Sequence, residues 1–292
     1  MTQTRRRFLA ISAAALAVPM GAQAAPVAHW RGRALGADAS IALAGISQIE
    51  ARPLLARLAK ELDRLEGIFS LYRPDSALAR LNRTGRLDQA PPEFLSVLGH
   101  CEAIHHASGG VFDPTIQPLW QAMARGEDTA RARALVGWSG VQVSDGTVSF
   151  KRPGMAMTLN GIAQGKITDH IAGWLAARGF SDVLVNTGEI AARGRRAQGD
   201  AWHAGIAVSD GRILRRLELS NRALATSEPR IGTGAAHILD PRGGSASQSL
   251  VSVSAPRAVL ADGLSTACCL MPQVHAHGLV SRFEGAAIEW LA

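Results

Sequence analysis

The strongest candidate for chemistry lies in an apolar stretch near the C-terminal end of the chain, where an acid and a hydroxyl residue stand four positions apart. Asp262 and Thr266 fall within a helix predicted over residues 258–270, so both side chains lie on one face of it. A carboxylate and a hydroxyl are oxygen ligands of the kind that Mg²⁺ prefers. The alternative is structural, with Asp262 capping the helix and Thr266 an ordinary helical residue.

Two other segments place polar side chains in turns that a ligand can approach. The segment Leu159-Asn160-Gly161-Ile162-Ala163-Gln164-Gly165 precedes a predicted helix, so its backbone amides suit a phosphate and its carbonyl groups suit a metal. The segment 237–244 sets His237, Asp240 and Arg242 around a second turn. Both segments are also typical of ordinary turns, in which Gly and Asp-Pro serve the backbone geometry alone.

Several familiar site motifs do not occur in the sequence. It has no Gly-x-Gly-x-x-Gly, no Gly-x-x-x-x-Gly-Lys-Ser/Thr, no His-Glu-x-x-His and no Gly-x-Ser-x-Gly. The dinucleotide-fingerprint and P-loop classes are therefore excluded.

The elements that must position the candidate residues follow from the hydrophobic periodicity. A long amphipathic helix is predicted over 47–68, and helical patterns cover 91–108, 114–136, a segment from about 165 to 179, 258–270 and 273–284. A hairpin turns at Asp145-Gly146 within 141–150. Further strands are predicted at 155–159, 182–186, 204–208, 213–219, 250–253 and 286–291. This mixed order, with antiparallel hairpins and packed helices, predicts the α+β class.

Length and composition indicate one globular domain or two closely packed lobes. The 292 residues carry 31 Lys and Arg against 24 Asp and Glu, a formal charge of +7, and 47% of them are apolar. Only three are Lys, and the Arg residues are scattered along the chain, so nucleic-acid binding is excluded as a function. The odd set Cys101, Cys268 and Cys269 predicts buried thiols and no disulfide framework.

The N-terminus has the pattern of a twin-arginine export signal. Thr4-Arg5-Arg6-Arg7-Phe8-Leu9 is followed by an apolar run over 10–20 and by Ala22-Gln23-Ala24, a small-residue cleavage site. The apolar run is short for a bilayer span, although an uncleaved anchor is the alternative. We therefore predict a signal at 1–24, a mature domain at 25–292, and a periplasmic location, either soluble or resting on the inner membrane.

Seven segments, in this order along the chain, resemble the ApbE family of FAD:protein FMN transferases. They are Tyr72-Arg73-Pro74-Asp75-Ser76 with Leu81-Asn82, Phe112-Asp113-Pro114-Thr115, Gly161-Ile162-Ala163-Gln164-Gly165 with Asp169, Asn186-Thr187-Gly188-Glu189, Ala225-Thr226-Ser227, His237-Ile238-Leu239-Asp240-Pro241, and Ala261-Asp262 with Ser265-Thr266.

The resemblance implies a fold, an activity and partners. It implies an α+β protein with FAD in a cleft between lobes, and Mg²⁺-dependent transfer of FMN from FAD to a threonine hydroxyl, with release of AMP. The acceptor would carry a Ser/Thr-Gly-Ala-Thr type motif in a membrane-associated redox subunit. Two alternatives remain: an FAD pyrophosphatase that yields FMN and AMP, and a non-catalytic periplasmic FAD carrier or assembly factor.

The resemblance also implies roles for individual residues. The implied metal ligands are the Gly161 carbonyl, Asp262 and Thr266, and the implied catalytic residues are His237 and Asp262. Residues implied to bind the flavin nucleotide are Tyr72, Asp113, Gly165, Asp169, Asn186, Gly188, Thr226, Ser227 and His237.

Three positions depart from the family pattern. Gln164 stands where many relatives have Lys, Lys166 where many have an aromatic residue, and Thr187 replaces the first of two glycines. Loss of the lysine removes a cation directed at phosphate, which Lys166 is expected to restore in part.

Overall fold

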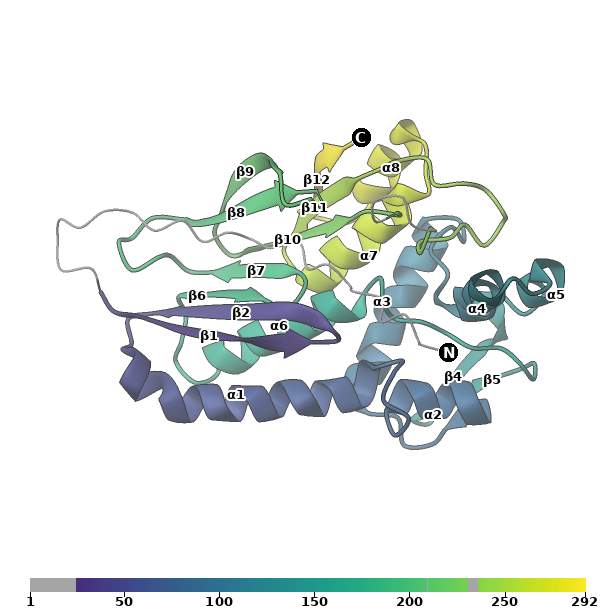
Figure 1. Cartoon of the computed structure of the whole chain (residues 1–292), viewed down its shortest axis with the longest axis horizontal. Helices are drawn as coiled ribbons and strands as arrows, with labels where there is room; N and C mark the ends of the chain where they lie inside the picture. The colour runs from purple at the N-terminus through teal and green to yellow at the C-terminus, as the bar shows by residue number, and fades with distance from the viewer. Residues whose placement is uncertain (1–24, 209, 231–235) are drawn as a thin grey trace.

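A seven-stranded antiparallel sheet forms the centre of the fold in the computed structural model, which describes residues 25–208, 210–230 and 236–292 (Figure 1). Its strands lie in the order β1-β2-β6-β7-β10-β11-β12, and each neighbouring pair is antiparallel. They are β1 (Val27–Ala34), β2 (Ala37–Ala44), β6 (Val183–Asn186), β7 (Ile190–Arg193), β10 (Arg222–Ser227), β11 (Val251–Ala255) and β12 (Ala287–Leu291).

The two faces of this sheet bury different side chains, because successive residues of a strand point in opposite directions. Along β2, Ile41 and Leu43 join the large core beneath the helices, whereas Ala42 and Ala44 pack against the other cluster. That second cluster includes Trp202, from the separate hairpin of β8 (Trp202–Ala207) and β9 (Ile213–Leu219). The sheet is thus covered by helices on one face and by a hairpin on the other.

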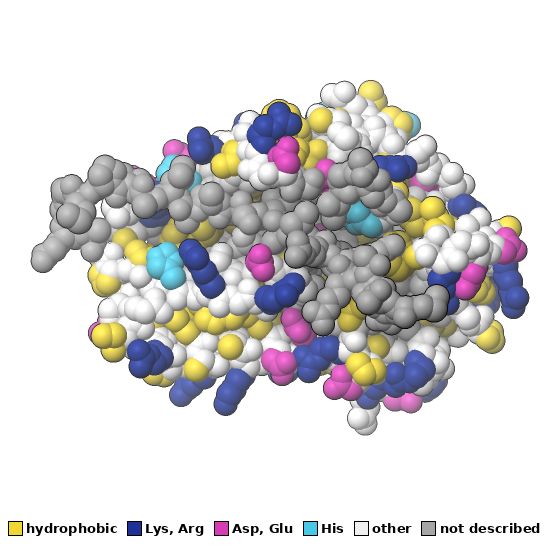
Figure 2. Space-filling model, viewed as in Figure 1, with side chains coloured by type: hydrophobic (Ala, Val, Ile, Leu, Met, Phe, Trp, Pro, Cys, Tyr) yellow, Lys and Arg dark blue, Asp and Glu magenta, His cyan; other side chains and the backbone are white. Residues whose placement is uncertain are grey.

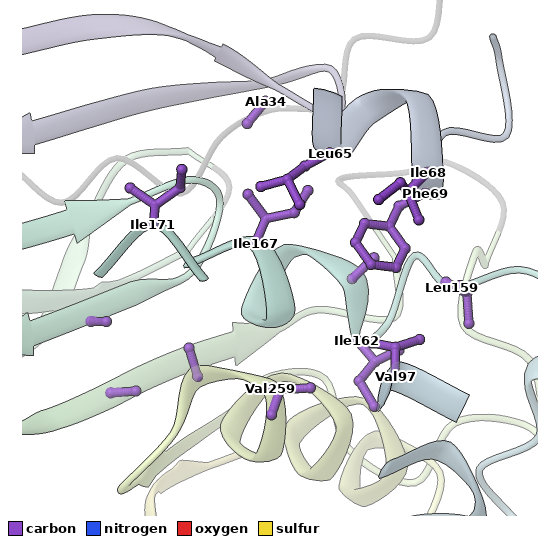
Figure 3. Packing of buried hydrophobic residues seen from close by; sticks show 14 of the residues in the cluster. Ala34, Leu65, Ile68, Phe69, Val97, Leu159, Ile162, Ile167, Ile171 and Val259 are labelled. Carbon is purple, nitrogen blue, oxygen red and sulfur yellow. The ribbon is translucent and has the colours of Figure 1, made fainter. Parts of the chain in front are cut away.

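Three helices cover the helical face: α1 (Gln48–Phe69), α6 (Ala163–Ala176) and α7 (Ala258–Cys269). Ser47 and Glu50 form a capping box at the start of α1, which explains why the helix begins there. Figure 3 shows Leu65 of α1 and Ile167 of α6 pointing toward one another within the core. α6 lies between α1 and α7 and contacts both helices.

The remaining elements lie beyond one end of the sheet, except α8, which packs against α7 and β12 (Figure 1). They are α2 (Ala77–Thr84), β3 (Arg86–Leu87), α3 (Pro92–Ala107), the 3₁₀ turn η1 (Pro114–Ile116), α4 (Gln117–Arg125), α5 (Thr129–Arg133), the 3₁₀ turn η2 (Trp138–Gly140), β4 (Val141–Ser144), β5 (Thr147–Phe150) and α8 (Gln273–Val280). Strands β3, β5 and β4 form a small antiparallel sheet.

The α+β class is confirmed, and so is the predicted hairpin, in which Asp145 and Gly146 both adopt positive φ. The strand predicted at 155–159 is wrong. Its backbone is extended, but Asn82 takes the place of a neighbouring strand: its amide accepts the Met157 N–H and donates to the Met157 carbonyl oxygen, both at 2.8 Å.

The helix predicted over 114–136 is divided in the structure into η1, α4 and α5. Gly126 adopts a left-handed conformation, with φ of 69°, and this ends α4. The sequence prediction also missed β7 and β10, two neighbouring strands in the middle of the sheet.

Residues 1–24, and with them the predicted export signal, lie outside the described residues. Within the described residues, no helix combines the length and the apolar character that a membrane crossing requires. Figure 2 shows Lys and Arg side chains distributed over the visible face, with Asp and Glu between them.

Candidate active site

A pocket of about 650 Å³ opens between the main sheet with α7 and the group of helices beyond its end. That volume lies in the range of small-molecule binding sites. Its wall is formed by parts of α2, η1, α4, β10 and α7, by the turn at Gly188-Glu189, and by the segments 111–114, 158–164 and 237–239. Most residues implied by the resemblance line it: Tyr72, Asp113, Gly161, Gly188, Thr226, Ser227, His237, Asp262 and Thr266.

Asp262 lies in the middle of its helix, so it does not cap α7 as the structural alternative proposed. Its Oδ2 atom accepts a hydrogen bond from the backbone N–H of Gly165, in the first turn of α6, at 2.9 Å. In a regular helix this N–H would bond to the carbonyl of Gly161, four residues earlier. Among the described residues no donor reaches that carbonyl oxygen or the second Asp262 oxygen.

Gly161 and Thr266 are in direct contact across the pocket floor. A Cβ built on Gly161 would lie 2.8 Å from both Oγ1 and Cγ2 of Thr266. A larger residue here would push the Thr266 side chain away, and the close approach brings the Gly161 backbone beside the hydroxyl of Thr266. The backbone of Gly161, from a distant segment, therefore lies beside the helix face that Asp262 and Thr266 were predicted to share.

Ser227 at the end of β10 links this floor to the main sheet. Its hydroxyl lies 2.8 Å from the Ser265 hydroxyl and 3.3 Å from that of Thr266. The Ser265 hydroxyl donates to the carbonyl oxygen of Asp262 at 3.0 Å. These bonds fix α7 against β10 and hold Thr266 in place.

Two buried carboxyl groups face the pocket, and sequence reasoning assigned no role to one of them. Burial raises the pKa of Asp262 to about 7, and burial together with the Asp262 charge raises the pKa of Glu189 well above its usual value. The Glu189 carboxylate accepts the Thr226 N–H at 3.3 Å. The sequence signal for Glu189 is its place directly after Gly188, as an acid in the turn that follows a predicted strand.

The donor set fits a hard divalent cation. Two acids buried in a low-dielectric site favour either a bound proton or a nearby cation. Asp262, Gly161 and Thr266 all line the pocket, and the Gly161 backbone lies beside the Thr266 side chain. Among residues 25–208, 210–230 and 236–292, no group of three or more His, Cys, Asp and Glu side chains is arranged to hold a metal. A cation here would therefore rely on the hydroxyl and the carbonyl as well.

Asp113 shapes the opposite wall of the pocket. Its Oδ1 atom accepts hydrogen bonds from the N–H and hydroxyl of Thr115, at 2.8 and 2.6 Å, and its Oδ2 atom accepts from the N–H of Trp138 at 3.1 Å. His105 Nδ1 lies 3.9 Å from the same carboxylate. Asp113 thus ties the Phe112–Thr115 turn to η2, while still lining the pocket.

Tyr72 and His237 lie on the pocket wall, far apart in sequence. Tyr72 is 67% exposed and its backbone N–H donates to the Ser70 hydroxyl. His237 is held through its backbone N–H, which donates to the Pro229 carbonyl oxygen at 2.9 Å. Tyr72 and His237 therefore line the same pocket.

Three residues implied to bind the flavin nucleotide lie outside the residues that line the pocket. Gly165 is the contact point between α6 and α7, and Asp169 accepts hydrogen bonds from the first two N–H groups of α7. Asn186 holds the following turn, because its Oδ1 atom accepts the Gly188 N–H at 3.1 Å. Each of them shapes an element that does line the pocket.

The three departures from the family pattern occupy different environments. Gln164 lines the pocket and packs on Gly188, where a Cβ would lie 2.3 Å from its Nε2 atom. Lys166 points elsewhere and donates to the Ser96 hydroxyl at 2.8 Å, so it does not restore the missing cation. Thr187 is fully buried, and its hydroxyl lies 2.6 Å from that of Thr168, so its side chain stays out of the pocket.

The fold and the pocket define an α+β protein with a nucleotide-sized binding site that has an oxygen-rich floor. Comparison with known proteins makes this specific, since residues 35–289 match the ApbE family. The chain therefore belongs to the ApbE family.

Curated relatives agree with this assignment. An FAD:protein FMN transferase from Salmonella typhimurium is 26% identical, with the match spanning 92% of this chain and 86% of the relative. One of the same name from Treponema pallidum is 29% identical over 77% of this chain and 73% of the relative.

Solved structures share the fold. The flavin transferase ApbE from Vibrio cholerae superposes with a TM-score of 0.79 at 23% identity, over 90% of this chain and 93% of the other. The apo form of flavinyl transferase ApbE from Pseudomonas stutzeri superposes with a TM-score of 0.77 at 26% identity, over 90% of each chain.

Proposed function

We propose that this protein transfers FMN from FAD to a threonine hydroxyl of an acceptor protein and releases AMP. The observation that carries the proposal is the pocket itself, a nucleotide-sized cavity lined by Asp262, Thr266 and Gly161, in which the Gly161 backbone lies beside the Thr266 side chain. The curated relatives, all named FAD:protein FMN transferase, support the same reaction.

Asp262, Thr266 and the Gly161 carbonyl would hold Mg²⁺. Bound there, the ion would neutralise charge on the pyrophosphate of FAD, which is the usual contribution of a metal to phosphoryl transfer. These residues suit Mg²⁺ because their ligand atoms are hard oxygen donors. No lysine among the described residues supplies positive charge in the pocket, since Lys166 is bonded to Ser96.

The protein's own residues supply position and proton transfer. The threonine oxygen of the acceptor attacks the phosphorus atom of the FMN half, and the bond from that phosphorus to the AMP oxygen breaks. His237, on the pocket wall, takes the threonine proton, since a neutral imidazole is a suitable base near neutral pH. Asp113 holds the Phe112–Thr115 turn against η2, and Ser227 holds α7 against β10, so each stabilises one wall of the pocket.

The proposal also includes the acceptor protein and the cellular location of this protein. We infer an acceptor threonine within a Ser/Thr-Gly-Ala-Thr type motif of a membrane-associated redox subunit, and export to the periplasm by the twin-arginine route. The pattern of residues 4–24 supports the export route. Replacing Arg5 and Arg6 with Lys should retain the protein in the cytoplasm, and a periplasmic fraction unchanged by these substitutions would contradict the route.

Mass spectrometry on the mature protein tests the reaction. The protein is mixed with FAD, Mg²⁺ and an acceptor domain that carries the motif, with and without chelator. A gain of one FMN on the acceptor threonine, lost on chelation, is the expected result. Free FMN and AMP with an unmodified acceptor would identify a pyrophosphatase, and intact FAD would identify a carrier; either outcome overturns the transferase.

A replacement of His237 by Gln tests the proton step separately. At saturating FAD we expect a fall of about 10²-fold to 10⁴-fold in turnover, the usual contribution of a general base. Full turnover in this variant would assign the proton to another group.

A further inference from the structure

The two helices that form the pocket floor exchange carboxylates. Asp169 of α6 accepts the N–H groups of Ala258 and Val259, the first two residues of α7, at 2.7 and 3.0 Å. In return, Asp262 of α7 accepts the N–H of Gly165, in the first turn of α6, at 2.9 Å. Each helix therefore supplies an anion to the N-terminus of the other.

Neither helix caps itself. The residues at the N-cap positions are Ile162 for α6 and Arg257 for α7, and neither side chain makes a capping hydrogen bond. The first N–H groups of a helix have no partner within the helix, and its N-terminus carries partial positive charge. Asp169 and Asp262 satisfy both needs from across the helix interface, so the two bonds act as a reciprocal cap.

The backbones of α6 and α7 are in close contact at Gly165. A Cβ on Gly165 would lie 2.3 Å from the Ala258 carbonyl oxygen and 2.8 Å from the Asp262 Cβ. Glycine therefore sets the closest approach of the helices, while the two carboxylates hold them at it. Asp262 lies one turn beyond Ala258, and Gly161 lies four residues before Gly165.

We propose that Asp169 is a positioning residue for the transfer reaction, acting through the start of α7. By holding Ala258 and Val259 it places Asp262 and Thr266 at the distance from Gly161 that the cation site needs. Both Asp169 oxygens are occupied by these N–H groups and the residue does not line the pocket, so its role is distinct from the nucleotide contact implied by the family resemblance. The inference rests on the proposed Mg²⁺ site of the transferase.

The Asp169→Asn variant tests this role, because its amide retains one acceptor and loses the other together with the charge. Asp128→Asn is the matched control: Asp128 accepts the Ala130 N–H at the start of α5 and does not line the pocket. Mg²⁺ affinity is measured by calorimetry, FAD affinity without metal by flavin fluorescence, and the helix starts by hydrogen–deuterium exchange over 163–167 and 258–266.

For Asp169→Asn we expect Mg²⁺ binding about tenfold weaker, in keeping with the loss of a charged helix cap, and FAD affinity without metal within about twofold of wild type. Exchange should accelerate at both helix starts, although only the α7 contact is altered. The control should match wild type in all three measurements. Unchanged Mg²⁺ affinity, or an equal loss of metal-free FAD affinity, would overturn the positioning role.

A second variant keeps the test decisive if Asp169→Asn does not fold. Gly165→Ala leaves Asp169 intact but forces the helices apart, so it should weaken Mg²⁺ binding by a similar factor; wild-type Mg²⁺ affinity in this variant would overturn the inference. If wild-type protein transfers no FMN, the proposed function fails. Exchange at 258–266 still decides whether Asp169 holds α7.

Discussion

Adding a single methyl group at Gly161 probes the geometry of the pocket floor. In Gly161→Ala the new Cβ would lie 2.8 Å from the Thr266 Oγ1 and Cγ2 atoms, about 0.6 Å inside the 3.4 Å at which ordinary contacts begin. Gly161 does not have positive φ, so the backbone itself tolerates alanine. The strain therefore falls on the Thr266 side chain, which must move.

The Gly161→Ala substitution should affect both the packing of the pocket floor and the geometry of Mg²⁺ coordination. Overpacking a tight contact costs about 1–3 kcal/mol of folding stability. Mg²⁺ accepts oxygen ligands only near 2.0–2.1 Å in octahedral geometry, so a displacement of about 0.6 Å removes the hydroxyl from its coordination. We expect folded protein with Mg²⁺ affinity reduced at least about tenfold.

The assay is a Mg²⁺ titration of thermal stability and of FMN transfer. Gly173→Ala is the control, since a Cβ at this position of α6 has no atom within 4 Å and alanine should stabilise the helix by about 0.5–1 kcal/mol. In a Thr266→Ala background, Gly161→Ala should cost less stability, because the clashing atoms are gone. Wild-type Mg²⁺ affinity in Gly161→Ala would refute the assignment of this contact to the metal site.

Three further predictions concern buried polar groups. Because burial raises the pKa of Asp262 from 3.8 to about 7, its contribution to the stability of metal-free protein is present below pH 4 and is lost as the pH rises through 7; Asp262→Asn should flatten this dependence in urea unfolding at pH 5 and 8, and an unchanged slope would contradict the shift. Asp113→Ala loses three hydrogen bonds and should lower the free energy of unfolding by about 2–4 kcal/mol. A loss under about 1 kcal/mol would argue against the role of Asp113 in holding the Phe112–Thr115 turn to η2. Burial raises the pKa of all three cysteine thiols, so alkylation followed by mass spectrometry should modify them only after unfolding, and rapid labelling of native protein would contradict their burial.

The parts of the site that could be predicted from sequence are those set by local periodicity. Asp262 and Thr266 are four residues apart in a clear helical pattern, so their shared face follows from helix geometry alone. The hairpin at Asp145-Gly146 was equally clear, because both residues tolerate the positive φ of its turn. The regular apolar periodicity of residues 47–68 likewise predicted α1 (Gln48–Phe69).

The parts that were missed depend on partners distant in sequence. Met155, Met157 and Leu159 are buried in alternation, as in a strand, but their segment is paired with the Asn82 amide instead of a ladder. Strand β7 has only four residues, three of them buried in succession, so it lacks the alternation that identifies a strand. No local pattern shows that the Asp169 carboxylate reaches the start of another helix.

The scattered origin of the pocket has a consequence for how the chain folds. Its wall draws on residues from Ala37 to Leu270, and strands β2 and β6, neighbours in the sheet, are separated in sequence by nearly half the length of the chain. Contacts of such long sequence separation form late, after the entropy of closing large loops has been overcome. A ligand-competent cavity is thus among the last features to appear, and retention of FAD would report that the entire domain has reached its native state.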